Sequence, residues 1–269
     1  MREVTDQDRA VFEEDGVVLL HGAFDEAWIT FLQEAVDEAM ANPGPHAMEY
    51  AREGRFFGDV ELAHRLPAFM RFVCESPAAG YAGLIMGSSK VNYFDDHLLV
   101  KEPGTTKPSP WHQDQPYWAV AGRQVCSLWL PLDPVSRDVA VEFVRGSHTW
   151  QAFNPYHFED GRLYEGAGLP PLPDIESHRK HYEILRFPME PGDALMFHGM
   201  IVHGAPGNTG HHRRRALSTR WTGDDARFHR RPGEISVPTV LPDLADGACL
   251  DCGRFPVVWR RHLPRPDAS

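Results

Sequence analysis

The chain has 269 residues, 42% of them apolar, and a formal net charge of −11, which suits a globular protein of one large domain or at most two. The acidic balance argues against a general binder of nucleic acid or of anionic membranes, because both need a basic face. No stretch approaches the ~20 apolar residues of a membrane span, and the N-terminus is acidic and polar rather than apolar as in a signal peptide. We therefore expect a cytoplasmic protein whose partner is a small molecule, in an oligomeric state that the sequence leaves open.

The first 88 residues predict a mainly helical part. Thr5, followed three positions later by Asp8, is typical of a helix start, and Gly16 is expected to end that helix. Residues 17–20 predict a short buried strand, and Asp25 begins a second helix that ends before Pro43. Residues 55–59 predict a strand or an ordered loop, and two more helices are expected at 67–74 and 77–86.

From residue 90 the hydrophobic period changes to two, which indicates strands. Strands are expected at 91–101, 124–132, 139–144, 182–187, 194–198 and 214–221, with a loop at 102–110 and a turn region at 204–211. Many short strands after a helical part favour a double-sheet jelly roll with flanking helices. We expect one domain over 1–269, with a helical part at 1–88, a jelly-roll core at 89–221 and a wrapped tail at 222–269.

A long segment without clear periodicity spans residues 149–181, and such segments are usually functional or mobile. It carries aromatic side chains, and we interpret it as a lid or a substrate wall, the alternative being a packed surface excursion. The four cysteines are too few for a disulfide framework. Cys249 and Cys252 form a C-x-x-C, but a structural zinc takes four ligands, so we interpret them as two thiols in a loop.

The main candidate for chemistry is the stretch Trp111-His112-Gln113-Asp114-Gln115. His112 and Asp114 are two positions apart, so on an extended strand both side chains leave the same face. His203 is the candidate for a third ligand. Two imidazoles and one carboxylate, with no thiolate, favour iron(II) and leave open coordination positions. Arg214, eleven residues after His203, is the kind of group that holds a carboxylate through a bidentate fork.

An H-x-D tripeptide alone is more often a partly buried histidine beside a solvated aspartate. Here it is accompanied by Val100-Lys101-Glu102-Pro103-Gly104, Arg145-Gly146-Ser147-His148, Glu190-Pro191-Gly192-Asp193 and the segment from His203 to Ser218. In this order and at these spacings the motifs resemble the phytanoyl-CoA dioxygenase family of iron- and 2-oxoglutarate-dependent oxygenases. The resemblance covers residues 13–221 and implies a mainly β fold, the double-stranded β-helix (a cupin-like jelly roll).

The resemblance also implies cofactors and roles. His112, Asp114 and His203 would hold Fe(II), with 2-oxoglutarate and O₂ as co-substrates, and Arg214 would bind the far carboxylate of 2-oxoglutarate, while strand alternation should point Arg215 away. Further co-substrate or supporting contacts are expected from Trp129, Lys101, Ser218 and His97. Ser218 is considered because Ala205 stands where the family often has a serine.

The resemblance implies a reaction type as well. Related halogenases have a small residue in place of Asp114, so hydroxylation of an unactivated C–H bond, with decarboxylation of 2-oxoglutarate to succinate and CO₂, is expected instead. Desaturation or cyclisation would use the same site.

The sequence predicts the substrate less sharply. Tyr117 and Trp118 are candidate pocket walls, and Arg220 and Arg227 are candidate receptors for an anion, so a small polar or acidic substrate is expected. One alternative is a metal-dependent jelly-roll enzyme without 2-oxoglutarate, such as an isomerase or a dioxygenase that uses its substrate alone, which would have no use for Arg214. The other is a binding protein with a vestigial site, which would be expected to lack a metal ligand.

Overall fold

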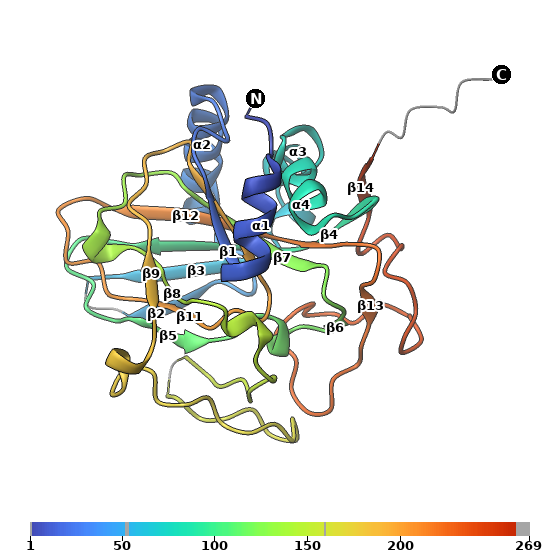
Figure 1. Ribbon diagram of the computed structural model, residues 1–269. Coiled ribbons are helices and arrows are strands. Elements are labelled where there is room, and N and C mark those ends of the chain that lie inside the picture. Colours follow the sequence, from blue (N-terminus) through green and yellow to red (C-terminus); the bar gives the residue numbers. More distant parts are fainter. Residues whose placement is uncertain (1, 52–53, 159, 262–269) are drawn as a thin grey trace.

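The computed structural model describes residues 2–51, 54–158 and 160–261. Its α-helices lie in the N-terminal part and gather on one side of the molecule (Figure 1). The side chain of Thr5 and that of Asp8 form the expected capping box at the first helix, and Gly16, at φ 82°, ends it. The helices are α1 (Asp6–Asp15), α2 (Glu26–Ala41), α3 (Pro67–Glu75) and α4 (Ala78–Met86). The helices predicted from the sequence are therefore confirmed.

The larger sheet of the described residues has eight antiparallel strands, in the order β1-β10-β7-β12-β4-β3-β2, with β14 also paired to β4. Its long central strands are those that the period of two predicts, and residues 56–60 form a strand rather than a loop. The strands are β1 (Val17–Leu20), β2 (Met48–Ala51), β3 (Phe56–Val60), β4 (Lys90–Lys101), β7 (Val125–Pro131), β10 (Ala194–His198), β12 (Arg214–Thr222) and β14 (Val257–Arg260).

A smaller antiparallel sheet in the described part of the chain has the order β5-β11-β8-β9. Its strands are β5 (Ser109–His112), β8 (Glu142–Val144), β9 (Ile184–Arg186) and β11 (His203–Ala205). Three expectations were wrong at this sheet. Gly204 and Ala205 continue a strand instead of opening a turn, and residues 139–141 precede β8 rather than belonging to it. Residues 109 and 110, expected at the end of a loop, begin β5. The two sheets form the mainly β jelly roll that the sequence predicts.

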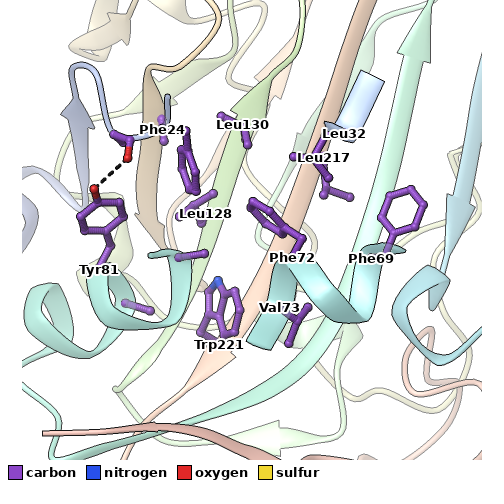
Figure 2. Packing of buried hydrophobic residues seen from close by; sticks show 14 of the residues in the cluster. Phe24, Leu32, Phe69, Phe72, Val73, Tyr81, Leu128, Leu130, Leu217 and Trp221 are labelled. Carbon is purple, nitrogen blue, oxygen red and sulfur yellow. Dashed lines mark hydrogen bonds between the residues drawn. The ribbon is translucent and has the colours of Figure 1, made fainter. Parts of the chain in front are cut away.

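The main hydrophobic core lies between the helices and the larger sheet (Figure 2). Phe72 of α3 and Tyr81 of α4 both contact the ring of Phe24, at centroid distances of 5.5 and 5.9 Å. The hydroxyl of Tyr81 donates to the carbonyl oxygen of Ala23 at 2.8 Å, so its polar atom is satisfied inside the core. Because helices cover this face, the other face of the larger sheet is left for the smaller sheet and the site.

The described residues after 222, which end at 261, lie against the jelly roll. Strand β13 (Arg227–Phe228) pairs with β6 (Val120–Ala121), and β14 pairs with β4. Cys249 and Cys252 are free thiols, as expected. Among the described residues, no helix has the length and apolarity needed to cross a membrane.

Candidate active site

Three potential metal ligands meet at the smaller sheet. His112 is the last residue of β5 and His203 the first of β11, and the two are paired across the antiparallel strands. Asp114 does not continue β5: its backbone is helical (φ −73°, ψ −50°) and it precedes a 3₁₀ turn at Gln115–Tyr117. The extended geometry expected for His112 and Asp114 was therefore wrong, yet one ligand atom of each residue in the triad lies within 4.8 Å of the others.

Hydrogen bonds to backbone carbonyls fix the tautomers of both histidines. Nδ1 of His112 lies 2.8 Å from the carbonyl oxygen of Pro110, and Nδ1 of His203 lies 3.1 Å from that of Ile201. A carbonyl only accepts, so each Nδ1 carries the proton and each Nε2 presents a lone pair. The Nε2 atoms lie 3.4 and 3.8 Å from Oδ1 of Asp114.

The electrostatics of this cluster suit a cation. Burial and the neighbouring His112 lower the pKa of His203 to about 4, so the imidazole is neutral. Burial alone would raise the pKa of Asp114, but the polar and charged groups around it, the guanidinium of Arg220 among them, hold it below its ordinary value, so the carboxylate is charged. Three acceptor atoms that face one another repel unless a cation lies between them. Nitrogen and oxygen donors without thiolate fit iron(II).

Arg214 lies in the same cavity, and its position supports the predicted role. Its side chain is 5% exposed, and it donates to the carbonyl oxygen of Val139. Burial lowers its pKa to about 10, so it stays charged at neutral pH. Among the described residues no carboxylate forms an ion pair with it, and a buried unpaired cation is costly without an anionic ligand. Arg215 points the other way, as expected, and pairs with Asp133 at 2.8 Å.

A cavity of about 490 Å³ joins the triad to Arg214. Most of the sequence-predicted contact residues lie on its wall; these are His97, Tyr117, Trp118, Trp129, Ser218 and Arg220. Lys101 does not: it is fully buried, its ammonium donates to the carbonyl oxygen of Pro206 at 2.9 Å, and it lies over the ring of Phe56. Arg227 also lies outside, on β13, where it donates to backbone carbonyls.

Arg220 is occupied by a partner that the sequence did not reveal. Its guanidinium forms an ion pair with the fully buried Asp95, which faces it on β4, and a second nitrogen lies 3.2 Å from Nδ1 of His97. Its positive charge is therefore balanced inside the protein. The expectation that Arg220 receives an anionic substrate has no support in this geometry.

Several residues of the site were missed or identified only as part of a segment. Tyr50 and Phe56 line the cavity from β2 and β3, where the sequence has no clear period. Tyr156, Phe158 and Tyr164 line it from the segment 149–181, so part of this segment is a wall of the cavity, as one of the two interpretations predicts. Ser127 on β7 donates to Oδ2 of Asp114 at 3.0 Å. Ser127 and Trp129 are two positions apart on the predicted strand, so their side chains leave the same face. This pattern could have predicted that Ser127 faces the site.

Comparisons with known proteins agree with this geometry. The family model described as "Phytanoyl-CoA dioxygenase (PhyH)" matches residues 12–216. A "probable phytanoyl-CoA dioxygenase" of Caenorhabditis elegans is 25% identical over 148 residues, which are 52% of this chain and 46% of that protein. The chain thus spans about half the length of this curated relative.

Solved structures share the fold. The crystal structure of the "non-heme alpha ketoglutarate dependent carbocyclase SnoK from nogalamycin biosynthesis" superposes with a TM-score of 0.78 at 20% identity, covering 96% of this chain and 97% of that one. The structure of EctD from S. alaskensis with 2-oxoglutarate and 5-hydroxyectoine gives a TM-score of 0.69 at 18% identity, covering 85% and 79%. At these identities the likeness concerns the fold alone.

Proposed function

The chain belongs to the phytanoyl-CoA dioxygenase family, and from this premise we propose that it is an Fe(II)- and 2-oxoglutarate-dependent oxygenase. The proposed reaction hydroxylates an unactivated C–H bond of a small molecule, with O₂ consumed and 2-oxoglutarate converted to succinate and CO₂. One observation supports it above the others: three facing ligand atoms and a buried arginine without a carboxylate partner among the described residues line the same cavity.

Each residue has a definite task in this proposal. His112, Asp114 and His203 would hold Fe(II), which when bound supplies the activation of O₂. The carbonyls of Pro110 and Ile201 keep both Nε2 lone pairs directed at the metal position. Arg214 would bind the far carboxylate of 2-oxoglutarate, and Trp129 and Ser218, which share the cavity wall, would contact its carbon chain or oxygens. His97 would contact the substrate instead, and Lys101 would support the wall through Phe56.

The presence of Asp114 bears on the reaction type. A carboxylate there fills the position that a halide would need, so halogenation is disfavoured. Hydroxylation and ring formation require the same ligands. The fold is shared with a carbocyclase and with EctD, and we favour hydroxylation because it needs no second reactive group on the substrate.

The main alternative is a metal-dependent jelly-roll enzyme that does not use 2-oxoglutarate. Such an enzyme would keep the triad but leave Arg214 buried and charged without an anion to bind. Because that arrangement is costly, the geometry favours the oxygenase.

The test is succinate formation by anaerobically purified protein that is reconstituted with Fe(II) and then given 2-oxoglutarate and O₂. Wild type should form succinate slowly even without the substrate, and His112→Ala should form none. The control His211→Ala changes an exposed histidine and should match wild type. A wild-type protein that binds Fe(II) but neither binds nor consumes 2-oxoglutarate would rule out the oxygenase in favour of the alternative.

A further inference from the structure

Aromatic rings line the cavity beside the metal position. The ring of Phe158 lies 4.9 Å from that of His112, between centroids, at an interplanar angle of 72°. Tyr117, Tyr156 and Tyr50 follow at 6.0, 5.8 and 6.4 Å from Phe158. These residues come from β2, from the 3₁₀ turn that follows Asp114 and from the segment 149–181. Three separate parts of the chain thus place their rings around the same space.

The hydroxyls of two of these tyrosines are already bonded to the backbone. The hydroxyl of Tyr117 donates to the carbonyl oxygen of Tyr156 at 2.9 Å and accepts from its amide at 3.0 Å. The hydroxyl of Tyr156 donates to the carbonyl oxygen of Trp111. Because these polar atoms are occupied, Tyr117 and Tyr156 offer mainly their ring surfaces to a ligand, and such surfaces prefer other rings in stacked or edge-to-face contact.

Two ionisable groups on the described wall already have partners. Arg220 is paired with Asp95, and His157 lies 2.9 Å from Glu234. Arg214, the remaining guanidinium on this wall, is assigned to 2-oxoglutarate. It lies on β12 six residues from Arg220, which is about 20 Å along a strand. A substrate carboxylate at the Arg220 end would therefore meet no unpaired guanidinium among the described wall residues, and its burial would be costly.

His97 offers one oriented polar group at this end of the cavity. Arginine only donates, so Nδ1 of His97, 3.2 Å from the guanidinium of Arg220, must accept, and the ring proton is on Nε2. Nε2 lies 3.4 Å from the hydroxyl of Tyr50, near the upper limit for a hydrogen bond. A ligand oxygen can share or replace this long contact. Arg220, held by Asp95, thus acts as a positioning residue that keeps Nδ1 of His97 an acceptor and its ring N–H on Nε2.

We propose that the substrate is a neutral, ring-containing molecule that packs against Phe158 and its aromatic neighbours and accepts a hydrogen bond from Nε2–H of His97 through a carbonyl or hydroxyl oxygen. This inference rests on the proposed function for the location of the reacting C–H bond. It replaces the polar or acidic substrate that the sequence suggests, and it makes His97 a residue that determines specificity.

Two sets of matched probes test the inference. Each set holds a ketone, the hydrocarbon that lacks its oxygen and a carboxylate: 1-tetralone, tetralin and tetralin-1-carboxylate, and 9-fluorenone, fluorene and fluorene-9-carboxylate. Binding is followed by quenching of tryptophan fluorescence, since Trp118 and Trp129 line the cavity, with the Fe(II)- and 2-oxoglutarate-loaded protein kept anaerobic. In both sets the ketone should bind best and the carboxylate worst.

Variants separate the ring contacts from the hydrogen bond. His97→Ala should weaken the ketones about 2- to 10-fold, the value of one hydrogen bond, and leave the hydrocarbons unchanged, whereas Phe158→Ala should weaken both. The control His212→Ala, at an exposed position, should change neither. Tighter binding of the carboxylates, no binding of either ketone, or equal losses of ketone and hydrocarbon in His97→Ala would overturn the inference. The titrations are repeated without Fe(II) and 2-oxoglutarate, so that binding of the probes is measured independently of the cofactors. A failure of the proposed function is reported separately, by the succinate assay.

Discussion

Ser127 on β7 donates a hydrogen bond of 3.0 Å to Oδ2 of Asp114, and this contact joins the candidate metal centre to the larger sheet. His112 and His203 belong to the smaller sheet, so the triad is held by both layers of the jelly roll. The bond occupies one carboxylate oxygen and leaves Oδ1 facing the two imidazoles. Asp114 needs this support because it lies beyond the end of β5.

Replacing Ser127 by alanine should weaken metal binding. Groups that orient a ligand commonly contribute about 10- to 100-fold to metal affinity, and we expect a loss in this range for Ser127→Ala. The measurement is an anaerobic Fe(II) titration, with Co(II) as a spectroscopic substitute. Ser136→Ala, at an exposed position just after β7, is the control. An unchanged affinity in Ser127→Ala would show that the backbone alone positions Asp114.

Arg214 and Arg215 are adjacent on β12 but have different surroundings, which makes them a matched pair. Loss of a buried charged contact costs about 2 kcal/mol or more, so Arg214→Gln should weaken 2-oxoglutarate at least about 30-fold. Arg215→Gln loses its bidentate pair with Asp133, so it should lower stability but leave the affinity for 2-oxoglutarate unchanged. Anaerobic calorimetry of 2-oxoglutarate binding gives the comparison. Equal affinities in the two variants would contradict the assignment of Arg214.

The sequence predicted β7, β12 and the side from which Arg214 enters, because a period of two fixes which residues share a face. It did not predict β11, which carries His203. It could not predict that Arg220 is paired, since Asp95 lies 125 residues away and is brought opposite by the pairing of β12 with β4. Likewise, Asp114 was placed on an extended strand because nothing local in H-x-D marks the helical turn that follows His112. Long-range register and a single change of backbone conformation account for both errors.

His198 should make the protein less stable in mild acid. Burial, with a smaller contribution from His148, lowers its pKa in the folded protein to about 4, against an ordinary value of 6.5. Between these values the unfolded chain binds a proton that the folded protein does not, so stability falls as pH decreases from 6.5 to 4. At about 1.4 kcal/mol per pH unit, His198 lowers the free energy of unfolding by about 2 kcal/mol at pH 5. Above pH 7 it has no such effect.

The variant His198→Asn isolates this contribution. Its side-chain oxygen can accept from the amide of Met200, as Nδ1 of His198 does at 3.0 Å, but it cannot titrate. Urea unfolding at pH 7 and pH 5 should show a smaller loss of stability in the variant than in wild type. Because carboxylates contribute equally to both proteins, the difference between the two losses reports His198. Identical losses would mean that His198 is protonated without unfolding.

The segment 149–181 should respond to ligands if it closes over the cavity. Tyr156, Phe158 and Tyr164 contribute to the wall, while Leu163 between them is 42% exposed. Trypsin should therefore cleave after the exposed Arg162 in the free protein. Adding Fe(II), 2-oxoglutarate and 9-fluorenone under anaerobic conditions should slow this cleavage several-fold, because ring contacts with the ligand would hold Tyr156 and Tyr164 in place.

Cleavage after Arg123, which is exposed on the loop before β7, serves as the internal control and should keep its rate. The variant Phe158→Ala should lose most of the protection, since Phe158 contacts the rings of Tyr117, Tyr156 and His112. If Arg162 is cut equally fast with and without ligands, the segment is a fixed wall and access to the metal does not depend on its closure. In that case the substrate must enter through an opening that is already present in the free protein.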